Sequence, residues 1–458
     1  MTKWIAAAAL AVACLGLSGL PARADDASSA PAATSAGSAA AAASGAGADL
    51  VRSSRFRIRP ADDAWRRSLP RDADAATQAY LDRLPADVVA SSNAYFEGGY
   101  WLILWNLLWG LAISWVLLAG RRGAHVRDWC ERKGRKPFLR DMFFGGFFAI
   151  VSWALSLPLD IYQGFVREHQ YEMATQTFGP WFAEHVTSLG VGVVVTSLMV
   201  GVLFAIIRAA RERWWLWGAV GMTAFMVVSI MISPVWIDPL FNTYRPVTDQ
   251  RVKQAVLQMA QADGVPADNV YEFDASRQTT RVSANVSGIF GSAAVRLNDN
   301  LLKTTLPEIR AVMGHELGHY VMNHIYKAIM EFALLFFAAF LFAKWAMEGL
   351  LRTQGVRWGL RGVGDVAALP LYAAVFGIFF FFATPIVNTM TRVQEIEADR
   401  FGLNLAREPH GEAEVDLKLA EYRKPDPGAI EEFIFFDHPS TRFRIHDAMR
   451  WRQAMGTE

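Results

Sequence analysis

Cysteine is almost absent from this chain of 458 residues, which contains only Cys14 and Cys130. Two cysteines cannot build a disulfide framework, and they cannot supply the thiolates of a cysteine-based zinc site. Any metal ion that this protein binds must therefore be held by histidine and carboxylate side chains.

An excess of charge of one sign is absent too. The 45 Lys and Arg residues nearly balance the 44 Asp and Glu residues, which gives a formal net charge of +1. No block of basic residues is interleaved with aromatic residues, as a nucleic-acid-binding surface requires. We therefore predict no nucleic-acid partner.

Long apolar runs, by contrast, are abundant. Hydrophobic residues make up 53% of the chain, and several runs are longer than the core helix of a soluble protein. The pattern predicts a mainly α-helical, polytopic membrane protein with the lipid bilayer as a partner. We expect about six transmembrane helices, at residues 98–119, 141–163, 186–208, 214–236, 325–347 and 366–389. Pro370 and Pro385 in the last of these segments suggest kinks or helix ends.

The amino terminus has the pattern of a bacterial secretory signal. Lys3 precedes an apolar run, and Ala22-Arg23-Ala24 has the small residues of a cleavage site, so residues 1–24 are predicted to be a signal peptide. The alternative is an uncleaved first membrane helix. Residues 25–50 are mostly Ala, Ser, Gly and Pro, which predicts a disordered linker.

Extramembrane segments alternate with the predicted spans. The segment 237–324 contains a helical pattern at Val252–Ala262 and strand patterns at Val270–Phe273, Thr280–Ser287 and Ala293–Leu297, which predict a small α+β unit with a short sheet. The predicted units are an N-terminal extramembrane segment 51–97, a four-helix membrane region 98–236, a catalytic segment 237–324, two membrane helices 325–389 and a C-terminal catalytic segment 390–458.

The sequence His315-Glu316-Leu317-Gly318-His319 has the spacing of a zinc endopeptidase site. Thr305 and Glu308 form a capping-box pattern just before it, which predicts a helix start. Residues four apart on a helix share a face, so both imidazoles can bind one tetrahedral Zn²⁺ and leave room for a third ligand and a water. Glu316 can then act as general base towards that water.

The third ligand is expected just after the last predicted span. Glu395 and Asp399 are four residues apart and share a helical face, while Glu397 points away from it. A carboxylate at Glu395 would complete a His, His, Glu site, and Asp399 could accept the second ring N–H of a ligand histidine. The alternative is that these acids form a solvated helix face.

Together these motifs resemble the M48 zinc metallopeptidases, and within them the CAAX prenyl protease 1 group. The similarity extends from about residue 95 to the C-terminus. The residues that carry it are His315 to His319, the segment from Glu395 to Asp399, Pro234 to Asn242, Ser283 to Gly288, and Asp437 to Ser440 with Arg444.

The resemblance implies a zincin-like catalytic domain and a role for each matching residue. His315, His319 and Glu395 would bind one Zn²⁺, Glu316 would be general base and acid, and Asp399 would orient a ligand. By the same likeness His438 would hydrogen-bond the oxyanion and Arg444 would orient that region. Asn285, Val286 and Ser287 would form an edge strand that pairs with the main chain of an extended peptide.

The chain departs from the family in two respects. The family strand usually reads Asn-Ala-Tyr, whereas this chain has Asn285-Val286-Ser287, so its substrate subsites are expected to differ. The CAAX prenyl protease 1 group has seven spans around a large chamber, and this chain has six if the signal peptide is removed. A more open chamber, or a retained amino-terminal run that serves as its wall, would account for the difference.

The leading hypothesis is a membrane-embedded zinc endopeptidase that cleaves peptide or membrane-protein substrates, including lipid-modified ones. One alternative with the same chemistry is an HtpX-like protease of membrane-protein quality control. An alternative of another class is a non-catalytic scaffold or transporter with structural zinc. A structural site normally closes with four protein ligands, whereas here the glutamate base lies beside an open position.

Charge bias predicts which side of the inner membrane carries the active site. Short loops rich in Lys and Arg stay in the cytoplasm, and the opposite loop 164–185 has only Arg167. The bias therefore places the zinc site in the periplasm, although the family resemblance implies the cytosolic side. The basic loop residues are Arg121, Arg122, Arg127, Arg132, Lys133, Arg135, Lys136, Arg140, Arg208, Arg211, Arg213, Arg352, Arg357 and Arg361.

Overall fold

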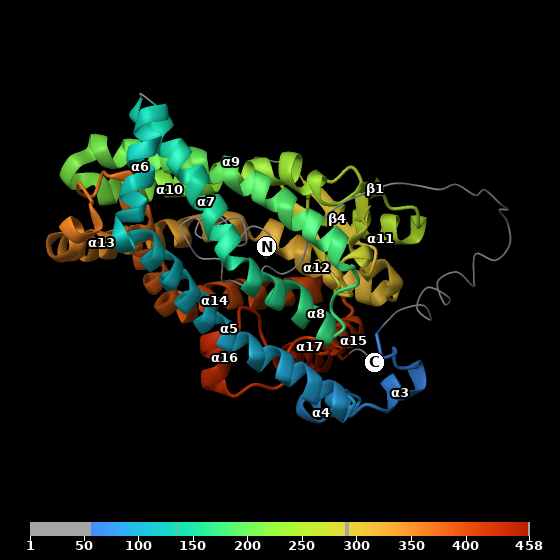
Figure 1. Ribbon diagram of the computed structural model, residues 1–458. Helices are drawn as coiled ribbons and strands as arrows, with labels where there is room; N and C mark the ends of the chain where they lie inside the picture. The colour runs from blue at the N-terminus through green and yellow to red at the C-terminus, as the bar shows by residue number, and fades with distance from the viewer. Residues whose placement is uncertain (1–55, 135, 289–292, 457–458) are drawn as a thin grey trace.

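The computed structural model describes residues 56–134, 136–288 and 293–456. The predicted signal peptide 1–24 and linker 25–50 lie outside the described residues. Most of the described chain is helical, and one four-stranded sheet lies at the end of the molecule opposite to α6 (Figure 1). The prediction of a mainly α-helical protein with a small sheet is confirmed.

Six long helices contain the six predicted spans, apart from a few residues at their ends. Within the described residues, five stretches are long and apolar enough to cross a membrane, and one of them, Phe178–Leu240, holds two of the helices joined by a tight turn. The helices are α5 (Ala86–Leu118), α7 (Pro137–Ile161), α9 (Phe178–Ala210), α10 (Trp214–Ile232), α13 (His324–Trp358) and α14 (Leu369–Ala406).

Large apolar side chains cover the outside of these helices. Trp101 on α5, Leu334 on α13 and Phe382 on α14 are 66%, 71% and 74% exposed. Inside the bundle, Phe204 of α9 and Phe340 of α13 belong to one continuous buried core. An apolar exterior around an apolar core is what contact with lipid tails requires.

Two helices extend beyond their predicted segments. α5 begins at Ala86, within the segment 51–97 that the sequence assigned to the extramembrane part. α14 passes without a break through the boundary predicted between residues 389 and 390, and Pro385, where a kink or helix end was expected, lies inside it. One helix therefore leads from the membrane bundle into the region of the third predicted ligand.

The sheet has the strand order β1-β2-β4-β3. Its strands are β1 (Tyr244–Pro246), β2 (Val270–Phe273), β3 (Ala284–Ser287) and β4 (Ala294–Asn298), and only β2 and β4 are parallel. The three predicted strands are present, the second of them shortened, whereas β1 was not predicted because three residues carry no alternating pattern. β3 is an edge strand of the described sheet, and it lies beside the helix α12 (Leu306–Val321).

The remaining α-helices are shorter. They are α3 (Asp63–Ser68), α4 (Ala73–Leu81), α6 (Arg122–Lys133), α8 (Arg167–Gln170), α11 (Gln250–Ala262), α15 (Pro409–Leu419), α16 (Ala429–Phe435) and α17 (Thr441–Met455). Val256 of α11, Leu297 of β4 and Leu317 of α12 are fully buried in one core. Full burial of such side chains contributes about 1.5–3 kcal/mol each, which attaches α12 firmly to the sheet.

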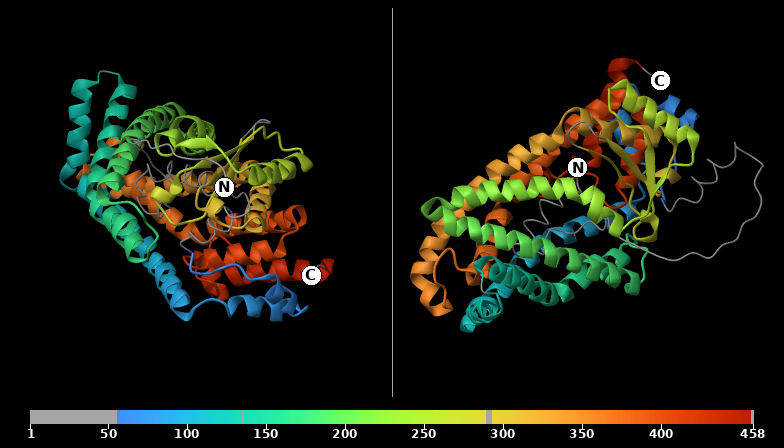
Figure 2. Two further views of the ribbon diagram at one scale, coloured as in Figure 1. Left: turned by 90° about the vertical axis from the view of Figure 1, so that its right-hand side faces the viewer. Right: turned by 90° about the horizontal axis from the view of Figure 1, so that it is seen from above.

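The N-terminal helices pack on the C-terminal ones. Tyr80 of α4 is buried with Leu417 of α15 and Ile445 of α17. The Arg83 guanidinium lies 2.9 Å from the buried carboxylate of Glu414. The views from the side and from above agree that residues 56–84 lie beside the C-terminal segment (Figure 2). The start of the described chain is therefore on the same face of the molecule as its end.

α12 and α14 cross at a point where glycines allow the two backbones to touch. A Cβ atom added to Gly402 would lie 2.7 Å from the backbone nitrogen of His315, and one added to Gly314 would lie 3.0 Å from the carbonyl oxygen of Gly402. No side chain fits in that space, so both helices need glycine here. The crossing fixes the distance between the two helices.

The substitution Gly402→Ala should push α12 and α14 apart, because the added methyl group meets backbone atoms that cannot rotate away. We expect a loss of about 1–3 kcal/mol in the stability of the detergent-solubilised protein, measured as a lower thermal unfolding midpoint. Gly349→Ala in α13 is the matched control, since its methyl group meets nothing within 4 Å and should be neutral or stabilising. Equal midpoints for the two variants would contradict this account.

Candidate metal centre

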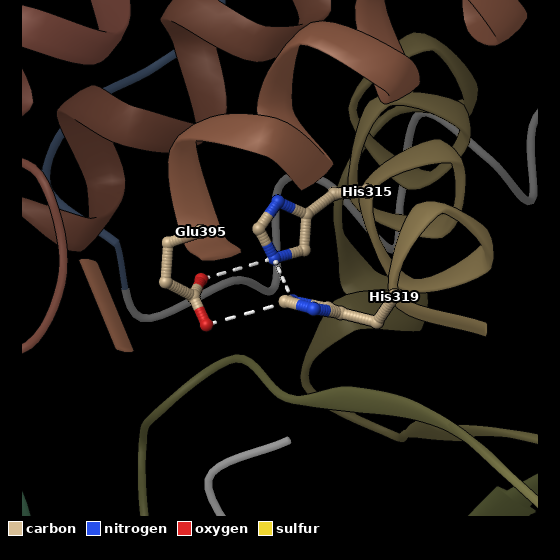
Figure 3. Close-up of side chains that lie close together, drawn as sticks. All are labelled: His315, His319 and Glu395. Atoms are coloured by element: carbon tan, nitrogen blue, oxygen red, sulfur yellow. Dashed lines mark hydrogen bonds and ion pairs between the residues drawn. The ribbon is translucent and has the colours of Figure 1, made fainter. Parts of the chain in front are cut away.

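Three predicted ligands converge between α12 and α14 (Figure 3). The Nε2 atoms of His315 and His319 lie 3.0 Å apart. His315 Nε2 is 3.2 Å from Glu395 Oε2, and His319 Nε2 is 3.5 Å from Glu395 Oε1. All three side chains are buried. Two donor nitrogens and a carboxylate thus face one common point.

These spacings fit a single divalent cation. Ligand atoms about 2.0–2.1 Å from a tetrahedral zinc ion are about 3.3 Å from one another, within the observed range of 3.0 to 3.5 Å. Three protein ligands leave a fourth position for a water or substrate oxygen, as catalytic zinc sites require. The described residues therefore supply a donor set of the catalytic type.

The electrostatics of the two histidines also suit a cation. Burial lowers the pKa of His315, but the hydrogen bonds to Asp399 and Glu395 outweigh burial and raise this pKa to about 10. Burial lowers the pKa of His319 to about 4. Without a metal ion, His315 is therefore protonated and His319 is neutral at neutral pH, and a metal ion would take the place of the extra proton on His315.

His315 contacts a network of buried charges through its Nδ1 atom. Its Nδ1 lies 2.7 Å from Asp399 Oδ1, and Arg444 Nε donates to Asp399 Oδ2 over 2.9 Å. Arg444 also donates to Glu412 over 3.1 Å and forms an ion pair with Asp416 at 3.0 Å. The contact expected between Asp399 and a ligand histidine is present, whereas Glu412 and Asp416 were not foreseen because no motif marks them.

His319 has a different partner. Its Nδ1 lies 2.7 Å from Nδ1 of His324, the first residue of α13, and His324 Nε2 lies 3.0 Å from Glu397 Oε2. Glu397 also accepts a hydrogen bond from Lys327 over 2.5 Å. The structure therefore brings Glu395, and not Glu397, to the two histidines. Sequence reasoning missed His324, although its position shortly after the motif was a possible signal.

The two predicted catalytic groups lie next to the ligands. Glu316 follows His315 on α12, is partly buried, and has its pKa raised by burial, which favours uptake of a proton. His438 Nε2 lies 3.3 Å from Glu395 Oε2, and its Nδ1 lies 2.9 Å from Asp437 Oδ1. Burial lowers the pKa of His438. His438 also lines a hollow together with Phe96 and other residues.

The predicted substrate strand is β3. Asn285 and Ser287 are buried, and Val286 is partly exposed. The N–H of Asn298 on β4 donates to the carbonyl of Ser283, so in this antiparallel pair residues 283, 285 and 287 bond to β4. The N–H and C=O of Val286 then face away from β4, towards the open edge of the described sheet.

Comparison with known proteins agrees with this geometry. A family model described as the CAAX prenyl protease N-terminal region, with five membrane helices, matches residues 67–243, and the model of peptidase family M48 matches residues 246–452. The chain is 30% identical over 352 residues to the uncharacterised metalloprotease YhfN of Bacillus subtilis, which covers 75% of this chain and 82% of YhfN.

Less similar relatives are named as CAAX prenyl proteases. The chain is 28% identical to the probable CAAX prenyl protease 1 of Schizosaccharomyces pombe, over 56% of this chain and 54% of that protein. It is 23% identical to CAAX prenyl protease 1 of Saccharomyces cerevisiae, over 67% of this chain and 71% of the relative. The crystal structure of S. mikatae Ste24p has a similar fold, with a TM-score of 0.58 and 20% identity, over 68% of this chain and 75% of that one.

Proposed function

This chain belongs to peptidase family M48 and is a membrane-embedded metalloprotease similar to CAAX prenyl protease 1, and we propose that it is a zinc endopeptidase whose metal is held by His315, His319 and Glu395. The observation that carries the proposal is the buried cluster of these three side chains with Glu316 beside it. Membership of a peptidase family speaks against the alternative of a non-catalytic scaffold or transporter.

In this proposal, each residue around the cluster has a separate role in hydrolysis. When bound there, zinc would polarise the scissile carbonyl group and acidify water. Glu316 takes the proton of the attacking water and delivers it to the leaving amine. His438, which lies beside Glu395, would donate a hydrogen bond from Nε2 to the developing oxyanion in its doubly protonated form, while its Nδ1–H donates to Asp437. Asp399 keeps a proton on His315 Nδ1, which leaves Nε2 free for the metal, and Arg444 fixes Asp399.

The substrate in this proposal is an extended peptide segment of a membrane-associated or lipid-bearing protein. Val286 on the edge strand β3 offers main-chain hydrogen bonds beside α12, a mode that selects backbone conformation more than side-chain sequence. Two of the candidate membrane helices, α13 and α14, lead directly to the site, so substrates that are already in the membrane have a short path to it.

We place the metal centre on the periplasmic side of a bacterial inner membrane. The basic loops lie together at one end of the molecule, where Arg127 pairs with Asp365 and Arg208 donates to the carbonyl of Gly364. The sheet and α12 lie towards the opposite end (Figure 1). Lys/Arg-rich short loops stay cytoplasmic. The packing of residues 56–84 on α15 and α17 also puts the segment that follows a predicted export signal on the side of the metal centre.

The substitution Glu316→Gln should abolish cleavage while zinc stays bound, because the amide cannot take up a proton but keeps the shape of the side chain. We expect a loss of at least about 10²–10⁴-fold in the rate of hydrolysis of a quenched fluorescent peptide. Zinc content by elemental analysis should match the wild type. The control is Glu348→Gln, an exposed glutamate on α13, which should keep both properties. Phenanthroline-sensitive cleavage by zinc-loaded Glu316→Gln protein would refute the mechanism.

Proline at Val286 should weaken peptide binding, because it removes an N–H that faces the open sheet edge and leaves the bonds to β4 intact. Loss of one such hydrogen bond, at about 0.5–1.5 kcal/mol, should raise KM roughly 2- to 12-fold without loss of zinc. Val286→Ala retains the N–H and serves as the control. Unchanged kinetics in a folded Val286→Pro protein would argue against substrate pairing at β3.

Alkaline phosphatase fused after Glu458 should be active and β-galactosidase fused there inactive, because the first enzyme works only outside the cytoplasm. The same phosphatase joined after Lys133, at the end of α6, should be inactive because that end carries the basic loops. The opposite pattern at both positions would place the metal centre in the cytoplasm.

A further inference from the structure

His324 is a fully buried histidine outside the predicted ligand set, and both of its ring nitrogens have partners. Nδ1 lies 2.7 Å from His319 Nδ1, and Nε2 lies 3.0 Å from Glu397 Oε2. The rings of His319 and His324 meet edge to face with centroids 4.9 Å apart. This arrangement connects a metal ligand to an acid that is not a ligand.

The contact depends on a break between α12 and α13. On a continuous helix, residues five apart are separated by about 140° and do not face each other. Here Asn323 has a left-handed backbone with φ of 58°, which ends α12 and turns His324 back towards His319. Asn tolerates this conformation better than other residues with a side chain.

Metal binding at His319 would fix which atoms carry protons along the row of hydrogen bonds that leads from His319 through His324 to Glu397. If Nε2 of His319 binds the metal, Nδ1 carries the ring proton and donates it to His324 Nδ1. His324 must then carry its own proton on Nε2 and donate to Glu397 Oε2. Lys327 donates to the same carboxylate oxygen at the partly exposed end of the row. Every hydrogen bond in the row then has one donor and one acceptor.

We propose that His324 is a positioning residue that holds His319 in the tautomer and orientation needed for metal binding. The inference rests on the proposed function, in which His319 is a zinc ligand. His315 is oriented by a carboxylate, Asp399, whereas His319 is oriented by a neutral imidazole that Glu397 and Lys327 hold in place. The two histidine ligands are therefore oriented by different kinds of group, a carboxylate for His315 and an imidazole for His319.

The test compares zinc dissociation constants, measured by competition with a chromophoric chelator, for the purified full-length wild type and three variants. His324→Leu fills the space but accepts no hydrogen bond, and it should bind zinc about 10–100-fold more weakly. His324→Gln can accept from His319 and donate to Glu397, and it should recover most of that loss. His185→Leu, which removes a partly buried imidazole on α9, should bind zinc as the wild type does.

Cobalt provides a second readout that does not depend on activity. The visible spectrum of Co²⁺-substituted protein should change in His324→Leu, because His319 is no longer held in one orientation, and should stay close to that of the wild type in His324→Gln. If His324→Leu does not fold, Glu397→Ala takes its place, since it removes the acceptor of His324 and should also weaken zinc binding. Glu397→Gln keeps an acceptor and is its control.

The outcomes separate the two proposals. A wild-type protein that binds no zinc would overturn the proposed function itself. A wild-type protein that binds zinc, together with His324→Leu of equal affinity and unchanged cobalt spectrum, would overturn the role of His324 alone. Weaker binding in His324→Leu with recovery in His324→Gln would support it, because a purely space-filling role predicts the reverse order.

Discussion

The close crossing of α12 and α14 is the constraint on which the metal centre depends. Gly314 and Gly402 let the two backbones touch, and His315, His319 and Glu395 converge within a turn or two of that contact. Ligand distances tolerate errors of only a few tenths of an ångström, so the helix separation must be set by rigid backbone contact and not by adaptable side chains.

Buried ion pairs reinforce the crossing, because a buried charge without its partner would be strongly destabilising. Arg444 is buried with Asp399, Glu412 and Asp416, and Glu308 at the start of α12 is buried with Lys418 of α15. Removal of one partner of a buried ion pair typically costs about 3–5 kcal/mol, since the other charge is left without compensation. Such pairs add little net stability, but they strongly disfavour any arrangement that separates α12 from the C-terminal helices.

Local patterns were sufficient to predict much of this structure. The apolar runs predicted the long helices, the alternating segments predicted β2 and β4, and Thr305 with Glu308 predicted the start of α12, where the capping box is present. The spacing of His315 and His319 and the shared face of Glu395 and Asp399 pointed to side chains that the structure brings together. Each of these signals lies within a few residues of chain.

What the sequence did not reveal depends on contacts between distant segments or on single backbone angles. Glu412 joins Arg444 only because α15 and α17 pack together, and β1 exists only because β2 offers it an edge. His324 was missed because the helical spacing rule places it away from His319, and the left-handed Asn323 reverses that. The unbroken α14 was missed because Pro385 is usually a helix breaker.

Because α14 is continuous, a tilt of its apolar part also displaces Glu395. The apolar part of α14 and the carboxylate of Glu395 belong to one rod, and the 12 helical steps from Ala383 to Glu395 span about 18 Å at 1.5 Å per residue. Rotation of such a rod by ~5° moves its end by ~1.6 Å, more than a metal–ligand bond tolerates. Helix tilt responds to the thickness of the surrounding bilayer. Bilayer thickness would then act on the proposed metal site through the tilt of α14.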